Sequence, residues 1–119
     1  MLTKEEKSKW IEALRSGRYQ QGSTYLCHTD DQSFQDQYFC CLGVLCDIRQ
    51  YEYEKSYHNL LWNKTYKFDG SVNHDQHLPF CLGLWNGRDI QYVLANMNDA
   101  GKTFEEIAYW IEENLPTKD

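Results

Sequence analysis

The sequence predicts an α+β fold in which residues 1–119 form a single compact domain. A chain of 119 residues has the size of one domain and can bury roughly two-thirds of the surface that its unfolded form exposes. Amphipathic helical patterns occupy both ends, and segments rich in strand-forming residues lie between them. We therefore expect an N-terminal helix, a small antiparallel sheet built from hairpins, a central helix and a C-terminal pair of helices.

The first helix is expected over residues 4–16. Thr3 and Glu6 have the spacing of a capping box, in which each side chain binds a backbone N–H group at the helix start. Apolar residues then recur at helical spacing, and Gly17 suits a left-handed helix end.

Two hairpins are expected to form the sheet. Residues 23–29 and 38–40 are rich in strand formers and are separated by a polar loop. An Asp-Gly dipeptide follows the alternating residues 64–68, which predicts a tight turn and a return strand over residues 71–73.

The most apolar run, residues 40–48, predicts a strand that ends near Cys40 and a buried helix over residues 42–51. Gly43 weakens the helix by about 1 kcal/mol relative to alanine. In a buried helix, a glycine often indicates the close approach of another element.

Two further helices are expected near the C-terminus. Apolar residues from Ile90 to Met97 form one stripe. Thr103 and Glu106 form a second capping-box pattern, and the helix that follows them should end before Pro116.

Composition argues against several classes of function. The 12 basic and 18 acidic residues give a net charge of −6 without a basic block, so we expect no binding to duplex nucleic acid. No apolar run approaches the roughly 20 residues of a membrane span, and the first residues lack the features of a signal peptide. We therefore expect a cytosolic protein without a membrane partner.

The five cysteines are an odd number, which disfavours a fully paired disulfide framework. We expect them to be reduced and mostly buried.

The spacing of the candidate residues does not favour a catalytic site or a metal site. His74 and His77 could bind zinc, but the chain has no Cys-x-x-Cys pair to complete a site. The neighbours Cys27 and His28 could form a nucleophile pair, although nothing nearby resembles an oxyanion hole. Acidic residues in turns are usually solvated turn formers. The acidic candidates for acid–base chemistry or for a divalent ion are Asp30, Asp31, Asp47 and Asp99. We expect a non-enzymatic protein without a metal or cofactor.

A polar and aromatic cluster offers a binding site instead. Aromatic residues make up 15% of the chain, and aromatic rings stack well on nucleobases. Residues 18–21, Arg-Tyr-Gln-Gln, place a cation, a ring and two amides together, which suits phosphate, base and base edge respectively. The alternative is structural, because arginines at the end of the first helix also complement its dipole.

Three motifs carry a resemblance to a family of small proteins of tailed phages and prophages. They are Leu-Arg-Ser-Gly-Arg-Tyr-Gln-Gln-Gly at residues 14–22, Cys-Cys-Leu-Gly-Val-Leu-Cys-Asp at residues 40–47, and the Asn-Asp-containing stretch at residues 94–108. The chain resembles this family over nearly its whole length, and departs most at residues 49–90. Small accessory phage proteins often counter host defence, and one strategy is a sponge that cages a nucleotide second messenger.

The resemblance and the binding cluster together lead to one expectation: an immune evasion protein in the host cytoplasm. It would sequester an ADP-ribose derivative, such as a cyclic ADP-ribose, or a cyclic oligonucleotide, without cleaving it. Rings would stack on the base, arginines would pair with phosphates, and amides and a carboxylate would read ribose hydroxyls or base edges. The residues for these roles are, in that order, Tyr19 and Trp85; Arg15, Arg18 and Arg88; and Gln21, Asn98 and Asp99.

A small ligand is buried more fully between two subunits than in one small domain, so we expect a homo-oligomer. Alternatives are a protein–protein inhibitor of a host defence protein, a hydrolase of the same signals, and a domain whose motifs serve only its core and caps.

Overall fold

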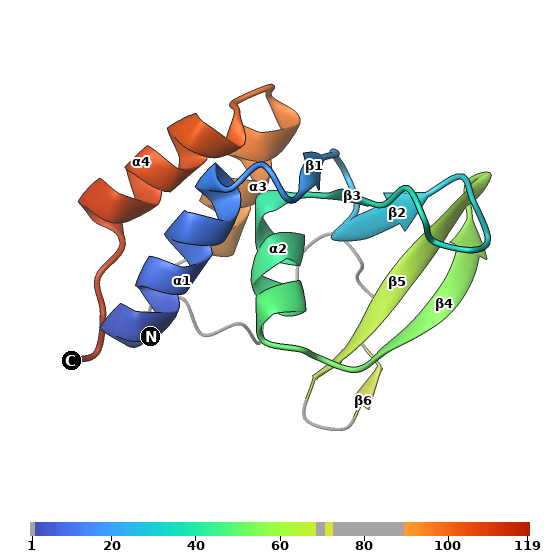
Figure 1. Cartoon of the computed structure of the whole chain (residues 1–119), viewed down its shortest axis with the longest axis horizontal. Helices are drawn as coiled ribbons and strands as arrows, with labels where there is room; N and C mark the ends of the chain where they lie inside the picture. The colour runs from blue at the N-terminus through green and yellow to red at the C-terminus, as the bar shows by residue number, and fades with distance from the viewer. Residues whose placement is uncertain (1, 69–70, 73–89) are drawn as a thin grey trace.

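The structure, a computed structural model, describes residues 2–68, 71–72 and 90–119 and confirms the α+β class. Helices form one side of the molecule and a sheet forms the other, with α2 between them (Figure 1). The helices are α1 (Lys4–Arg15), α2 (Cys41–Ile48), α3 (Ile90–Asp99) and α4 (Phe104–Asn114). The strands are β1 (Gln20–Gln21), β2 (Cys27–Thr29), β3 (Tyr38–Phe39), β4 (Tyr53–His58), β5 (Leu61–Phe68) and β6 (Ser71–Val72).

The strands follow the order β1-β3-β2-β5-β4, and β6 pairs with the end of β5. The antiparallel pairs β2–β3 and β5–β6 confirm the two expected hairpin pairings. Two strands were not expected. The short β1 pairs in parallel with β3, and β4 pairs along its whole length with β5. Both are mostly exposed, so neither has the apolar alternation that identifies a half-buried strand in a sequence.

The helix ends follow local signals. Both capping boxes form, at Thr3 with Glu6 and at Thr103 with Glu106. Gly17 has a φ of 78° directly after the end of α1. The helix α2 ends three residues before the expected Tyr51, because Gln50 adopts a φ of 58°, which the right-handed helix cannot accommodate.

Gly43 lies where α2 meets the chain before β2. A Cβ atom at this position would lie 1.7 Å from the carbonyl oxygen of Leu26. The expected close approach is therefore confirmed, and no larger residue fits here without movement of the backbone.

The core joins the helices to the sheet. The helix α1 packs against α4 and α2, and the indole N–H of Trp10 donates to the carbonyl oxygen of Cys41 at 2.9 Å. Cys27, Cys40, Cys41 and Cys46 are all buried and free, which agrees with the expectation of mostly buried thiols and settles the position of Cys40 and Cys41, which the sequence leaves open. Cys81 lies outside the described residues.

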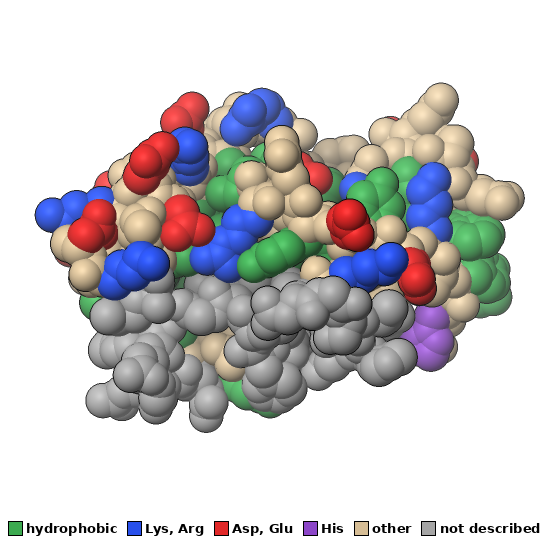
Figure 2. All heavy atoms as spheres, turned by 90° about the horizontal axis from the view of Figure 1, so that it is seen from below, with side chains coloured by type: hydrophobic (Ala, Val, Ile, Leu, Met, Phe, Trp, Pro, Cys, Tyr) green, Lys and Arg blue, Asp and Glu red, His purple; other side chains and the backbone are tan. Residues whose placement is uncertain are grey.

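Charged side chains of both signs lie along most of the face shown in Figure 2, and hydrophobic side chains gather at the end formed by β4 and β5. Among the described residues, no helix has the length and apolar character needed to cross a membrane.

Candidate functional site

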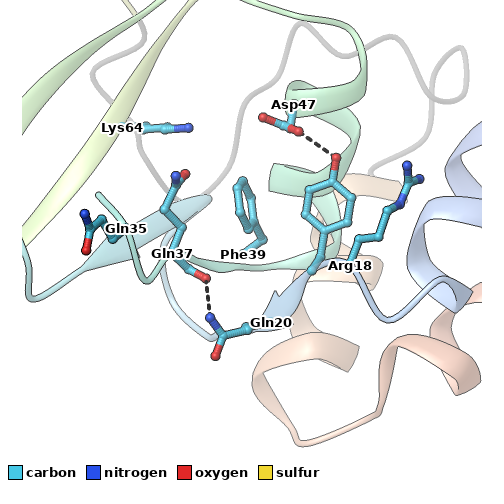
Figure 3. A pocket seen from close by; sticks show the side chains of 8 residues that line it. Arg18, Gln20, Gln35, Gln37, Phe39, Asp47 and Lys64 are labelled. Atoms are coloured by element: carbon cyan, nitrogen blue, oxygen red, sulfur yellow. Dashed lines mark hydrogen bonds between the residues drawn. The ribbon is translucent and has the colours of Figure 1, made fainter. Parts of the chain in front are cut away.

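A cavity of about 380 Å³ opens between β1, the chain leading into β3, α2 and β5 (Figure 3). Small-molecule sites usually have volumes of about 300–1,000 Å³, so this cavity has room for a small ligand. Its lining combines two cations, two aromatic rings, three amides and one carboxylate: Arg18, Tyr19, Gln20, Gln35, Gln37, Phe39, Asp47 and Lys64.

Lys64 is the most unusual of these residues, because it is only 6% exposed. Its Nζ lies 4.4 Å from the centre of the Tyr53 ring and 5.6 Å from that of Phe39. Within the described part of the chain, no carboxylate lies within ion-pairing distance of this ammonium. A buried charge normally has such a partner, since its desolvation costs several kcal/mol. Cation–π contacts offset only part of that cost.

A second lysine lies beside Lys64. Lys55 on β4 is directly opposite Lys64 on β5, so both side chains leave the same face of the sheet. The Nζ of Lys55 lies 4.9 Å from the centre of the Phe34 ring. Like charges directly opposite each other destabilise a sheet, and the pair therefore makes this face electropositive at a cost in stability.

Tyr19 and Asp47 form the opposite wall. The Tyr19 hydroxyl donates to Oδ2 of Asp47 at 2.6 Å, and the Tyr19 ring meets Phe39 edge-to-face with centroids 5.0 Å apart. Burial, followed by the hydrogen bond to Asp47, raises the pKa of Tyr19 to about 12. Tyr19 is therefore a neutral donor that holds the carboxylate in place.

Arg18 and the glutamines form the polar rim. The Nε of Arg18 donates to Oγ of Ser16 at 3.2 Å. The Gln20 amide donates to the carbonyl oxygen of Gln37 at 3.4 Å (Figure 3). The Gln37 amide in turn donates to the carbonyl oxygen of Phe34 at 2.7 Å. These bonds position the amides at the mouth of the cavity.

The structure divides the predicted binding residues among several places. It brings Arg18 and Tyr19 to the cavity. Arg15 lies instead between α1 and α4, where it forms ion pairs with Glu105 at 3.2 Å and Glu112 at 3.4 Å. Trp85 and Arg88 lie outside the described residues, as do His74 and His77.

Gln21, Asn98 and Asp99 come together in a separate network. The Oδ1 atom of Asn98 accepts from the backbone N–H of Cys41 at 3.2 Å and from the Gln21 amide at 3.0 Å. Its Nδ2 atom donates to the carbonyl oxygen of Gly22 at 2.7 Å. Asn98 is only 3% exposed, so its amide joins α2, α3 and the end of β1.

The two neighbours of Asn98 extend this network to other elements. The backbone N–H of Phe104 donates to Oε1 of Gln21 at 3.0 Å, and that of Thr24 donates to Oδ1 of Asp99 at 2.9 Å. All three residues thus form hydrogen bonds within the fold, and their role in ligand binding stays a prediction.

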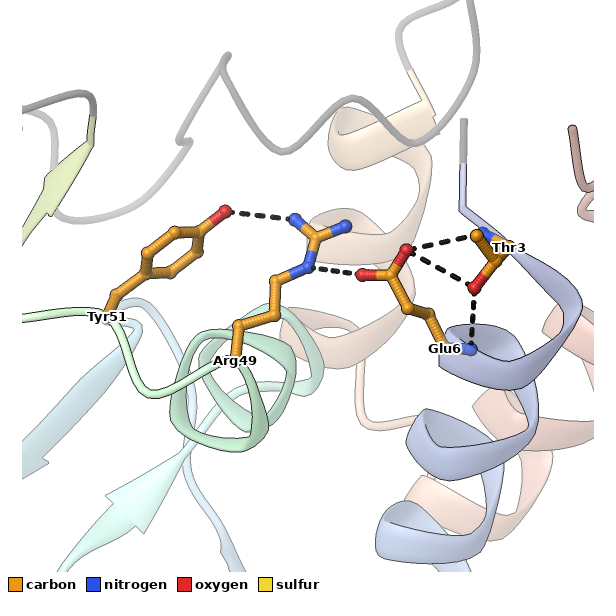
Figure 4. Close-up of polar contacts among 4 residues, drawn as sticks. All are labelled: Thr3, Glu6, Arg49 and Tyr51. Carbon is orange, nitrogen blue, oxygen red and sulfur yellow. Dashed lines mark hydrogen bonds and ion pairs between the residues drawn. The ribbon is translucent and has the colours of Figure 1, made fainter.

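A further polar cluster joins α1 to the end of α2 (Figure 4). Nε of Arg49 lies 3.1 Å from Oε2 of Glu6, and Nη1 donates to the Tyr51 hydroxyl at 3.1 Å. Burial acts to raise the pKa of Glu6, but the backbone hydrogen bond at Thr3 and the charge of Arg49 outweigh it and lower this pKa. Glu6 therefore caps α1 and holds α2 against it.

Sequence reasoning missed Lys64, Phe39, Gln35 and Gln37 as site residues. It placed Gln20 in the polar and aromatic cluster without a role of its own, and considered Asp47 only for acid–base chemistry or a divalent ion. One signal was present. Lys64 shares its side of β5 with Trp62 and Tyr66, because alternate residues of a strand face the same way. A lysine among aromatic residues on one face suggests either a buried charge or a ligand.

Two other kinds of candidate site are a nucleophilic cysteine and a metal site. Burial raises the pKa of the Cys27 thiol to about 12, although the charge of Lys64 opposes it, so Cys27 is protonated at neutral pH. In the described ranges, no three His, Cys, Asp or Glu side chains gather closely enough to hold a metal ion.

The model of one protein family, domain of unknown function DUF8296, matches residues 2–91. The chain belongs to this family, and every residue that lines the cavity lies inside the matched segment. No curated protein and no solved structure matches the chain.

Proposed function

We propose that this protein is a phage-encoded immune evasion protein that sequesters a nucleotide-derived signal in the host cytoplasm. The ligand would be an ADP-ribose derivative, such as a cyclic ADP-ribose, or a cyclic oligonucleotide, and it would leave the protein uncleaved. One observation carries the proposal: Lys64, a residue that is only 6% exposed, lines a cavity and has no carboxylate partner among the described residues. An anionic ligand would supply that partner.

The lining suits the parts of a nucleotide. Lys64 and Arg18 line the same cavity, and both can pair with phosphate oxygens. The aromatic rings of Tyr19 and Phe39 offer apolar surface to a base. Asp47 can accept from ribose hydroxyls, since a carboxylate that already binds the Tyr19 hydroxyl retains further lone pairs.

Binding and cleavage would use different groups of this cavity. Hydrolysis of a phosphoester needs an activated nucleophile or a positioned base. Lys64 and Arg18 would bind phosphate, and Asp47, held by Tyr19, is the carboxylate of the lining that a hydrolase would use as a base. The state in which the ligand is recovered therefore distinguishes sequestration from hydrolysis.

The test combines thermal stability with recovery of the ligand. Purified protein is heated with ADP-ribose, cyclic ADP-ribose isomers, cyclic di- and trinucleotides, or NAD. A ligand that binds only the folded state raises the melting temperature according to RT ln(1 + [L]/Kd). Any ligand that stabilises the protein is then released by heat and identified by liquid chromatography.

Two variants connect the result to the cavity. Lys64→Met should abolish the stabilisation. Lys67→Met removes a lysine charge three residues further along β5, where Lys67 forms an ion pair with Glu54 at 3.7 Å. The ligand should still stabilise this variant. Stabilisation with intact ligand recovered supports the proposal. A cleaved ligand would instead indicate a hydrolase, and no response to any nucleotide would favour the protein–protein inhibitor.

A further inference from the structure

We propose that a second copy of this chain binds along the outer edge of β4 and forms a symmetric dimer with one continuous sheet. The surface and its register go beyond the function proposed above. β4 is the last strand of the described sheet, and among the described strands its backbone pairs with β5 (Figure 1). It is six residues long and mostly exposed. Such an edge carries unpaired backbone groups that favour the addition of another strand.

The hairpin geometry identifies the outward-facing backbone groups. Asn59 and Leu60 have φ values of 51° and 67°, so they form a two-residue turn in which His58 and Leu61 exchange hydrogen bonds. Hydrogen-bonded and non-hydrogen-bonded pairs alternate from there. The bond from the Lys67 N–H to the Glu52 carbonyl oxygen, at 2.8 Å, fits this alternation.

It follows that Tyr53, Lys55 and Tyr57 direct their N–H and C=O groups away from β5. These groups are available to a partner strand, whereas Glu54, Ser56 and His58 bond to β5. An antiparallel copy of β4 would therefore exchange hydrogen bonds with Lys55 and Tyr57.

Among two-fold axes at Glu54, Lys55 and Ser56, the charges favour the axis at Ser56. Placing the two-fold axis at Lys55 would bring two lysines together, and placing it at Glu54 would bring two carboxylates together; like charges directly opposite each other are unfavourable. With the axis at Ser56, Glu54 lies opposite His58 of the second copy, and Lys55 lies opposite Tyr57 of the second copy.

This register also covers apolar surface. Tyr57 is 58% exposed and Leu60 is 82% exposed, and both belong to the β4–β5 end where hydrophobic side chains gather in Figure 2. Pairing at Ser56 would place the Tyr57 ring of each copy beside the Lys55 ammonium of the other, which favours a cation–π contact. The same edge carries Tyr53, whose ring lies over Lys64, so the interface would border the cavity.

The test is a cysteine placed on the proposed axis. Ser56 and its symmetry mate would form a non-hydrogen-bonded pair with Cα atoms about 4.5 Å apart, which lies within the range for a disulfide of about 4.4–6.8 Å. Ser56→Cys should therefore form a disulfide-linked dimer under mild oxidation. Glu54→Cys is the matched control, because its two copies would lie about 13 Å apart at the strand rise of 3.3 Å per residue. Wild-type protein, with its own five cysteines, gives the background.

Sedimentation velocity of the wild-type chain without ligand measures the oligomeric state directly. We expect a dimer that Tyr57→Pro returns to a monomer, since proline removes an outward N–H group without breaking a bond to β5. Ten-fold faster crosslinking of Ser56→Cys than of Glu54→Cys supports the register. A monomer at high protein concentration, or equal crosslinking of the two variants, overturns the proposal. Because ligand binding is measured separately, failure of the dimer leaves the proposed function standing.

Discussion

Replacing Lys64 with methionine should make the unliganded protein more stable while removing its ligand binding. Lys64 is 6% exposed, and the effective cost of burying an ion is several kcal/mol. Its cation–π contacts with the rings of Phe39 and Tyr53 each stabilise the folded state by about 0.5–2 kcal/mol. Methionine has a similar length, carries no charge and fills irregular apolar space well.

The balance of these terms predicts a gain of about 1–2 kcal/mol in the free energy of unfolding for Lys64→Met. For a domain of this size, a gain of this magnitude raises the melting temperature by roughly 4–8 °C. Loss of the charge opposite Lys55 acts in the same direction, since it removes a repulsion between like charges.

Urea denaturation followed by circular dichroism measures this change directly. The comparison variant is Lys67→Met, which removes an exposed ion pair and should alter stability by less than about 1 kcal/mol. If Lys64→Met is less stable than the wild type, the ammonium stabilises the fold. Lys64 would then serve the fold, and an anionic ligand would not be needed to explain its position.

Three other perturbations test the remaining structural arguments by thermal or urea denaturation. Asn98→Ala leaves the buried N–H of Cys41 without its acceptor and should cost about 2–3 kcal/mol, whereas Asn96→Ala on the exposed face of α3 should change stability by less than about 0.5 kcal/mol. Gly43→Ala would place a methyl group against the carbonyl oxygen of Leu26 and should lower the free energy of unfolding by about 1–3 kcal/mol or more. Burial lowers the pKa of His28, although the charge of Asp30 opposes this effect. Because His28 therefore binds a proton more readily in the unfolded chain, the free energy of unfolding should fall as the pH drops below about 6.5. His28→Gln should reduce this pH dependence.

Each of these three has a result that would contradict it. Equal losses in Asn98→Ala and Asn96→Ala would show that the buried network contributes no stability beyond an exposed side chain. A Gly43→Ala variant as stable as the wild type would mean that α2 can move away from the chain before β2. A His28→Gln variant with an unchanged pH profile between about pH 7 and pH 5.5 would assign the titration to another group.

The parts of the fold that follow local rules could be predicted from the sequence. Both capping boxes lie where their Thr-x-x-Glu spacing indicates, because these hydrogen bonds join residues three apart. The close approach of another element at Gly43 followed from the apolar character of its segment, whereas the burial of Cys40 and Cys41 could not be told from the sequence. In contrast, β4 was missed because an exposed edge strand depends on its partner β5 more than on its own residue pattern.

The candidate site was only partly predictable, since some polar residues bind other parts of the fold whereas others of the same type line the cavity. In the sequence, Gln21 and Asn98 look as suitable for a ligand as Arg18 and Tyr19 do. Only the tertiary structure shows that Gln21 and Asn98 bind each other across 77 positions of the chain, whereas Lys64, which had attracted no attention, is buried at a cavity. The class of fold and the helix caps could be predicted because they depend on apolar periodicity and on interactions between near neighbours in the chain. The tertiary structure decided which polar groups are already satisfied and which are left for a ligand, because distant segments supply their partners.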